Sequence, residues 1–307
     1  MRSLFRLIAA GMLVCSAFPG NAATVAYGES FDTLYRIDLA TREATSIGTA
    51  GTFSGQNIAN ISGLTAATNG SLYAVAGGFK LLLEVDPVAG LGAVIGSLGL
   101  SGQGSGQFDA LDLGMTSDCD GNFWLVSGVL KQLWKVDPRT GATTRVGDTG
   151  FAISGLVARG GVLYGSGSRA DHGFYRINET TGAATLVGNF GAGAPSILNS
   201  VSMSFDADGT LWAVLNYVPP TNGDVVPDWS DLAKIDPTTG AMTVVGPITG
   251  PAALRQAGMK GFVISPLQCL GGSVSPQPAP IGSPWALGLL GLLVGAAGLR
   301  RSRRLAC

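Results

Sequence analysis

The chain has 307 residues, of which 47 are glycine and only 13% are charged. Six of its 19 basic residues lie in two terminal segments, 1–22 and 270–307, which hold none of its 20 acidic residues. The part between them is therefore acidic, which argues against a nucleic-acid-binding protein, because such a protein presents a basic surface. High glycine content with low charge is typical of short strands joined by tight turns.

Residues 1–22 are organised like a secretory signal. Arg2 and Arg6 come before an apolar run from Leu7 to Phe18, and small residues follow up to Ala22. This order of charge, apolar run and small residues predicts export and cleavage after Ala22. A short buried helix is the alternative interpretation.

A pattern of about fifteen residues then recurs along the chain. In residues 133–147, apolar residues alternate as far as Asp137, a turn follows, and alternation resumes. Asp137 can accept a hydrogen bond from the backbone two residues on, Pro138 has a preset φ, and Gly141 can take the left-handed conformation that closes a hairpin. The other copies of the pattern occupy residues 34–48, 82–96, 174–188 and 232–246.

Each repeat contains an inner apolar segment, a Leu-Tyr or Leu-Trp strand, a third strand leading into the hairpin, and a fourth strand that ends in Val-Gly. Four strands per repeat of about 40–58 residues indicate an all-β fold, a β-propeller with four-stranded blades. The first repeat lacks an inner strand, while residues 258–263 form an inner strand without a blade of its own. Placing that strand in the first blade closes a ring of five blades over residues 23–268 and leaves no exposed sheet edge. Six blades and a solenoid of β-hairpins are the alternatives.

Two long irregular segments, 97–108 and 216–230, belong to the face at which the inner strands begin. Most Tyr and Trp residues keep a fixed position in the repeat, which predicts that they pack between blades. Tyr217 and Trp229 depart from this position. We therefore expect them, together with Asp224 and Asp228, to contact a ligand or partner.

Polar residues at the starts of the inner strands form a second candidate site, at the mouth of the central channel. They include Asn60, Asp109, Asp112 and Asn199. Carboxylate and amide oxygens are calcium ligands. The arrangement resembles lactonase-type propellers, and this resemblance implies a calcium ion and hydrolase chemistry at the mouth. Polar residues without a metal are the competing interpretation. The sequence contains no recognisable catalytic motif, and its single histidine is His172.

Two cysteines belong to the mature domain, one within the predicted propeller and one directly after it. Cys119 falls in a turn between a first and a second strand, and Cys269 follows the closing strand, which ends at the same face. In an oxidising compartment we expect Cys119 and Cys269 to form a disulfide. Two unrelated thiols are the alternative.

The chain ends in a linker rich in Gly, Pro and Ser (269–279) and a tripartite segment (280–307). A 19-residue apolar stretch from Ile281 is just long enough to span a membrane, and the arginines that follow place its end in the cytoplasm. The tail resembles the IPTL-CTERM and PEP-CTERM sorting signals of Gram-negative bacteria, although Gly282 stands where Leu is usual. The matching residues are Pro280, Ser283, Pro284, Trp285, Arg300, Arg301, Arg303 and Arg304.

This resemblance implies recognition by an exosortase-type membrane protease. The protein would be held in the inner membrane before processing and then delivered to the cell surface or extracellular matrix. A plain tail anchor is the alternative.

The body is similar to secreted bacterial repeat propellers with the pattern Leu-Tyr-x-Ile-Asp-Pro-x-Thr-Gly. Taken together, the sequence predicts an exported, non-enzymatic binding or scaffold module for a glycan or protein of the cell surface, with no cofactor. The alternative is a calcium-dependent lactonase or hydrolase.

Overall fold

The computed structural model describes residues 25–101, 111–196, 198–217, 230–252, 254 and 258–269. They all belong to one unit, residues 22–274. The predicted signal segment, the sorting segment and all but the first residue of the linker lie outside the described residues. Within the described part of the chain, no helix is long and apolar enough to cross a membrane.

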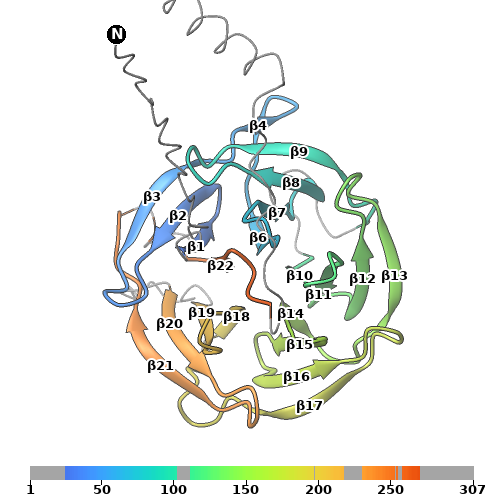
Figure 1. Cartoon of the computed structure of the whole chain (residues 1–307), viewed down its shortest axis with the longest axis vertical. Coiled ribbons are helices and arrows are strands. Elements are labelled where there is room, and N and C mark those ends of the chain that lie inside the picture. The colour runs from blue at the N-terminus through green and yellow to red at the C-terminus, as the bar shows by residue number, and fades with distance from the viewer. Residues whose placement is uncertain are drawn as a thin grey trace, which may run out of the picture. The chain divides into compact units, whose positions relative to one another are not determined.

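Five four-stranded antiparallel sheets, counted over the described residues, surround a common centre as the blades of a propeller (Figure 1). From the innermost to the outermost strand, blade 1 consists of β22 (Gly261–Ser265), β1 (Val25–Ser30), β2 (Thr33–Ile37) and β3 (Ala44–Thr49). In the same order, blade 2 consists of β6 (Ile61–Ala66), β7 (Leu72–Ala76), β8 (Leu81–Val85) and β9 (Gly92–Ser97). Blade 3 consists of β10 (Leu113–Ser117), β11 (Phe123–Ser127), β12 (Gln132–Val136) and β13 (Thr143–Asp148).

Blade 4 consists of β14 (Ile153–Arg159), β15 (Val162–Gly167), β16 (Gly173–Ile177) and β17 (Ala184–Asn189). Blade 5 consists of β18 (Leu198–Phe205), β19 (Leu211–Tyr217), β20 (Ser230–Ile235) and β21 (Met242–Pro247). A short hairpin of β4 (Thr52–Phe53) and β5 (Gln56–Asn57) connects blades 1 and 2. The fold is thus a five-bladed propeller, and neither six blades nor a solenoid.

Blade 1 is assembled from both ends of the unit. β22 pairs antiparallel with β1, from Val25 opposite Ser265 to Glu29 opposite Gly261. The innermost strand of this blade therefore comes more than 200 residues after the strand beside it.

The repeated hairpins have the predicted geometry. Asp137 Oδ1 accepts a hydrogen bond from the Arg139 backbone N–H at 2.8 Å, and Gly141 has a φ of 77°. Blade 1 differs, because Arg42 takes the left-handed position of the glycine, with a φ of 64°.

The outermost strands β3, β9, β13, β17 and β21 follow one another around the circumference, and we call them the outer belt (Figure 1). In four of the five blades, the glycine that follows the last Val or Ile of the outermost strand lies against the hairpin of the next blade. A Cβ on Gly147 would lie 1.8 Å from the Thr181 carbonyl oxygen, and one on Gly188 would lie 1.9 Å from that of Thr239. Gly48 and Gly96 make the same contact, so the repeat needs glycine here for close approach between blades.

The inner strands also approach one another closely, and we call them the hub. A Cβ on Gly114 would lie 2.1 Å from the Ser154 carbonyl oxygen, and one on Gly155 would lie 1.9 Å from that of Val201. The cavities that remain between the inner strands are small, about 10 Å³ each. Side chains such as Leu64 and Met203 line both of them, so the inner strands are closely packed there.

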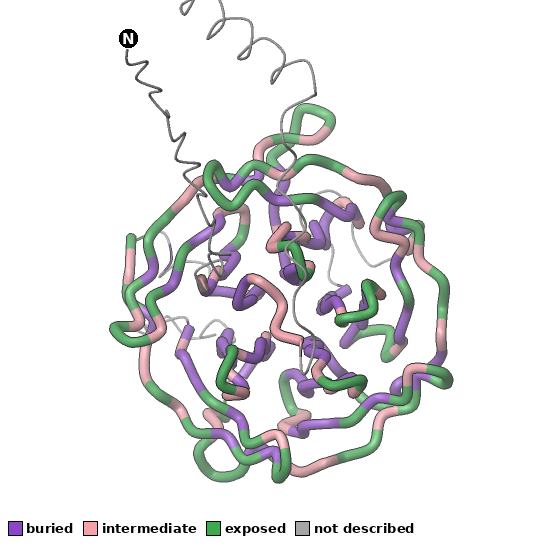
Figure 2. The backbone as a smooth tube through the Cα atoms, viewed as in Figure 1, coloured by how far each residue is buried: buried purple, intermediate pink, exposed green. Residues whose placement is uncertain are grey.

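After β22, residues 266–269 cross the centre of the ring, and we call them the cross-channel segment (Figure 2). The Leu267 N–H donates to the Ala67 carbonyl oxygen at 3.4 Å. Cys269 forms a disulfide with Cys119, as the sequence predicts, with Cα atoms 5.8 Å apart. The disulfide therefore links the end of blade 1 to the β10–β11 turn of blade 3.

The repeated aromatic residues pack in the core, which confirms their structural role. Trp124 and Tyr35 are 1% and 2% exposed. In two blades an aspartate of the turn before the second strand accepts a hydrogen bond from the indole N–H: Asp118 from Trp124 at 3.0 Å and Asp206 from Trp212 at 2.8 Å. The same carboxylates accept backbone hydrogen bonds within their turns, which is the role of a turn aspartate rather than of a calcium ligand.

Candidate functional site

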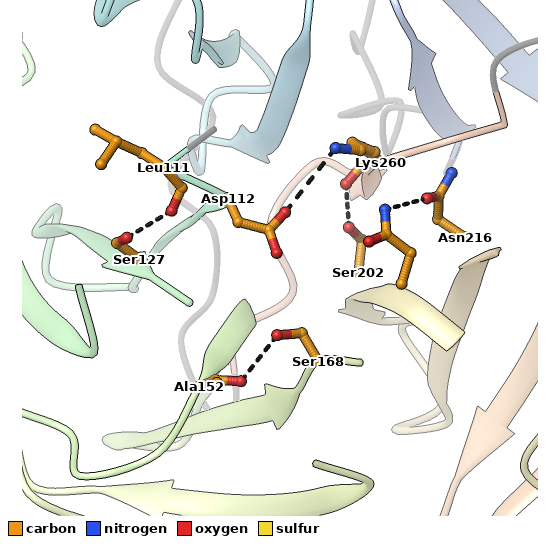
Figure 3. A network of polar contacts seen from close by, with 9 residues as sticks. Leu111, Asp112, Ser127, Ala152, Ser168, Ser202, Asn216 and Lys260 are labelled. Carbon is orange, nitrogen blue, oxygen red and sulfur yellow. Dashed lines mark hydrogen bonds and ion pairs between the residues drawn. The ribbon is translucent and has the colours of Figure 1, made fainter. Parts of the chain in front are cut away.

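The inner strands begin at one face of the ring, which we call the upper face. Asp112 and Lys260 immediately precede β10 and β22 there, and an ion pair joins them across the mouth of the hub (Figure 3). The Lys260 Nζ and Asp112 Oδ1 atoms are 3.9 Å apart, with side chains 28% and 10% exposed. The backbone of Asp112 has a φ of 53° and its carbonyl oxygen accepts a hydrogen bond from Gly128 N–H at 3.1 Å. Blades 1 and 3 thus meet at this mouth.

The other polar side chains around the mouth mostly hold strand ends together (Figure 3). Asn199 donates through Nδ2 to Asn216 Oδ1 at 2.9 Å. The hydroxyls of Ser127, Ser168 and Ser202 donate to the backbone carbonyl oxygens of Leu111, Ala152 and Lys260 respectively. These groups are committed to the protein itself.

The predicted calcium ligands do not form a calcium site in the described residues. Asp109 lies outside them, and the Asn199 amide donates to Asn216. Asp112 has the Lys260 ammonium beside it. A calcium ion takes six to eight oxygen ligands, and no cluster of three or more acidic, His or Cys side chains occurs in this part of the chain. The donors around Asp112 therefore do not fit calcium.

Glu29, on β1, is a buried acid that the sequence interpretation missed. Its side chain is 0% exposed, and neither carboxyl oxygen has a hydrogen-bond partner among the described residues. Burial raises the pKa of Glu29 to about 8, and the negative charge of Asp32 contributes to this rise. The carboxyl is therefore mostly protonated at neutral pH.

The position of Glu29 in its blade shows how unusual it is. It lies two residues after the repeated Tyr27, which pairs with Arg36 of the next strand. The equivalent residues of blades 2, 3 and 5, by the same pairing, are fully buried valines: Val75, Val126 and Val214. A carboxyl in place of a valine was the available sequence signal.

A groove of about 870 Å³ opens at the upper face between blades 3 and 4, and we call it the blade 3–4 groove. It is formed by the β11–β12 turn, the connection between the two blades and the β15–β16 loop. Asp112 reaches it from the mouth of the hub. The other lining side chains include Lys131, Phe151, Arg169, Asp171, His172 and Asn189.

The groove has a rigid aromatic wall. Phe151 is 39% exposed and its ring lies against that of Tyr175, with centroids 4.6 Å apart. Tyr175 donates its hydroxyl hydrogen to Asp171 Oδ1 at 2.6 Å. Burial, with this hydrogen bond, raises the pKa of Tyr175 above its usual range, so the phenol remains a donor that fixes Asp171.

The residues predicted to contact a partner are not brought together in the described structure. Trp229, Asp224 and Asp228 lie outside the described residues. Tyr217 is only 5% exposed, packs in the core between blades 4 and 5, and donates its hydroxyl hydrogen to Asp231 Oδ2 at 2.5 Å. The prediction that Tyr217 lies in the irregular segment 216–230 is wrong, because Tyr217 is the last residue of β19 and is buried.

Comparison with known proteins defines the class of this chain by its fold. No family model and no curated protein matches the sequence. A chain of the nidogen/laminin complex is similar with a TM-score of 0.50 and 15% identity, over 80% of this chain and 100% of that one. At this identity, the similarity describes the fold alone.

Two bacterial proteins of unknown function also match. The one from Bacteroides thetaiotaomicron VPI-5482 has 18% identity and a TM-score of 0.45, over 62% of this chain and 53% of its own length. The one from Bacteroides caccae has 10% identity and a TM-score of 0.47, over 79% of this chain and 99% of its own length. The chain thus spans about half the length of the first of these proteins.

Proposed function

We propose that this chain is an exported binding module that displays the blade 3–4 groove to a glycan at the cell surface or in the extracellular matrix. The observation that carries the proposal is the groove itself, a hollow of about 870 Å³ with an exposed aromatic side chain and several polar groups. Such a combination of an apolar surface and a few polar groups is typical of ligand sites.

A non-enzymatic role agrees with the chemistry of the upper face. The hydroxyls and amides at the mouth are bonded to strand ends, and Asp112 is paired with Lys260. Among the described residues, this arrangement favours the binding module over the hydrolase alternative.

Export and sorting belong to the same proposal. The signal segment ending at Ala22 and the C-terminal segment 280–307 would direct the chain to the inner membrane, where an exosortase-type protease would be its processing partner. The Cys119–Cys269 disulfide agrees with an oxidising compartment.

The proposal is tested by measuring the thermal unfolding of the full chain, kept in mild detergent, against purified bacterial surface polysaccharides. A ligand specific for the folded state adds about 2.7 kcal/mol of stability at a hundred times its Kd. We expect a stabilising polysaccharide whose effect is lost in Phe151→Ala and retained in Leu186→Ala. Leu186 is a matched control, because it is exposed on β17 and lies outside the groove. Stabilisation that is equal in both variants would contradict a site in the groove.

A further inference from the structure

The charges in the blade 3–4 groove point to the chemistry of its ligand, on the basis of the proposed function. Lys131 and Arg169 line the groove from opposite blades. Both are exposed, and neither forms an ion pair with a carboxylate among the described residues. Two positive charges are therefore available to a ligand.

The acidic side chains of the groove are already in use. Asp112 is paired with Lys260. Asp171 accepts the Tyr175 hydroxyl at 2.6 Å and the Gly173 N–H at 3.0 Å. With Asp112 paired to Lys260, Lys131 and Arg169 outnumber the remaining carboxylate, Asp171, and the groove keeps an excess of positive charge. The propeller as a whole is acidic, so this local excess favours an anionic ligand.

The backbone positions of both cationic residues are well defined. Lys131 and Arg169 have φ values of 51° and 56°. The Lys131 N–H donates to Ser127 O at 2.8 Å, and its carbonyl oxygen accepts from Thr149 N–H, also at 2.8 Å. The turns that carry the cations are therefore built into the strand pairings of their blades.

The aromatic wall distinguishes a sugar from other anions. Phe151 exposes its ring between the two cationic turns, and Tyr175 supports it from behind. A flat apolar ring is a suitable surface for the C–H face of a sugar, while Arg and Lys bind a carboxylate by charge-assisted hydrogen bonds.

We propose that the blade 3–4 groove binds an acidic glycan chain, with the carboxylate of a uronate-type sugar on Lys131 and Arg169 and a sugar ring on Phe151. The class of ligand is thus a carboxylated polysaccharide rather than a neutral one.

The test is calorimetric titration of the full chain, in mild detergent, with oligogalacturonate and with the same oligomer after methyl esterification. The ester keeps the sugar chain and removes its charge. We expect binding of the acid, binding at least tenfold weaker for the ester, and weaker binding at 1 M salt because exposed charges are then screened.

The variant Lys131→Gln with Arg169→Gln should weaken binding of the acid about tenfold, as expected for the loss of charge-assisted hydrogen bonds. Arg176→Gln is the matched control, because Arg176 is an exposed cation of the same blade as Arg169, on β16, outside the groove. It should leave the affinity unchanged.

The outcomes separate this inference from the proposed function. Equal binding of acid and ester, lost in Phe151→Ala, would overturn the acidic ligand and leave a glycan-binding groove. Binding of polyglutamate as tight as that of the uronate would overturn the choice of a glycan. If neither form of the oligomer binds, the acidic-glycan inference is overturned. The proposed function is tested separately, by the thermal unfolding of the chain with the panel of surface polysaccharides.

Discussion

The outer belt and the hub are built from the same five blades, yet they differ in how regular they are. In the belt, Gly96 and Gly147 receive the hairpin of the next blade at almost the same distance. On the second strands, next to the hub, blade 1 contributes Glu29 where three other blades contribute valine. At the mouth of the hub, the ion pair of Asp112 and Lys260 has no counterpart among the described residues. Regularity fixes the number and spacing of the blades, while departures from it supply the chemistry.

Among the changes that test this comparison, loss of the disulfide should change the free energy of unfolding most. It joins the cross-channel segment to the β10–β11 turn and closes a loop of 150 residues. A loop of that length is stabilising by about 5 kcal/mol in the chain-entropy estimate, with about 2–5 kcal/mol typical of native disulfides. The double variant Cys119→Ser with Cys269→Ser should therefore lose several kcal/mol of unfolding free energy in urea titration. The unaltered chain under reducing conditions is the control and should lose a similar amount. A loss below about 1 kcal/mol would show that the belt alone keeps the ring closed.

A methyl group in the belt should have the next largest effect. Gly147→Ala would place a Cβ 1.8 Å from the Thr181 carbonyl oxygen, and two backbones would have to separate. We expect a loss of about 3 kcal/mol, at the upper end of the usual cost of overpacking. Thr144→Ala, an exposed change in the same strand, should be nearly neutral in the same titration. If both variants unfolded alike, close contact between blades would not be what the repeated glycine provides.

Replacement of the buried acid should have an effect no larger than that of the methyl group, and of the opposite sign. Between about pH 4.5 and pH 8, folded Glu29 keeps a proton that the unfolded chain releases, so its contribution makes the protein less stable as the pH rises. Glu29→Val, which restores the residue of three other blades, should gain about 3 kcal/mol at pH 7 and remove this pH dependence.

The measurement for this variant is the difference in unfolding free energy from the unaltered chain at pH 5 and at pH 7.5. Glu29→Gln separates charge from size, because it removes the titration and keeps the polar shape. A difference that does not grow with pH would contradict the burial of an uncompensated carboxyl at this position.

The regular region could be predicted from the sequence in some detail. Asp137 and Gly141 predict the hairpin from local backbone preferences, and these do not depend on the rest of the fold. The unpaired strand at residues 258–263 predicts where the inner strand of blade 1 is found, and Cys119 and Cys269 follow from the face at which each strand ends.

The irregular region could not be predicted in the same way. Phe151, Lys131 and Arg169 come from three connections, and only the arrangement of two neighbouring blades brings them to one groove. Tyr217 departs from the repeat in sequence but remains in the core, because Asp231 on the adjacent strand accepts its hydroxyl. The spacing of aromatic residues along the chain does not show which polar side chain of a neighbouring strand, here Asp231, will lie beside a given tyrosine.

The cross-channel segment also determines how the ring responds to a pulling force. Tension applied to the chain beyond residue 269 first reaches Cys269, and the disulfide passes it to the β10–β11 turn of blade 3. β22 precedes Cys269 in the chain. Because the disulfide carries the force to blade 3, the force does not separate β22 from β1 one hydrogen bond at a time. A propeller tethered through its C-terminal side would therefore be held at a blade whose four strands are continuous in sequence, and its closing seam would be shielded from the tether.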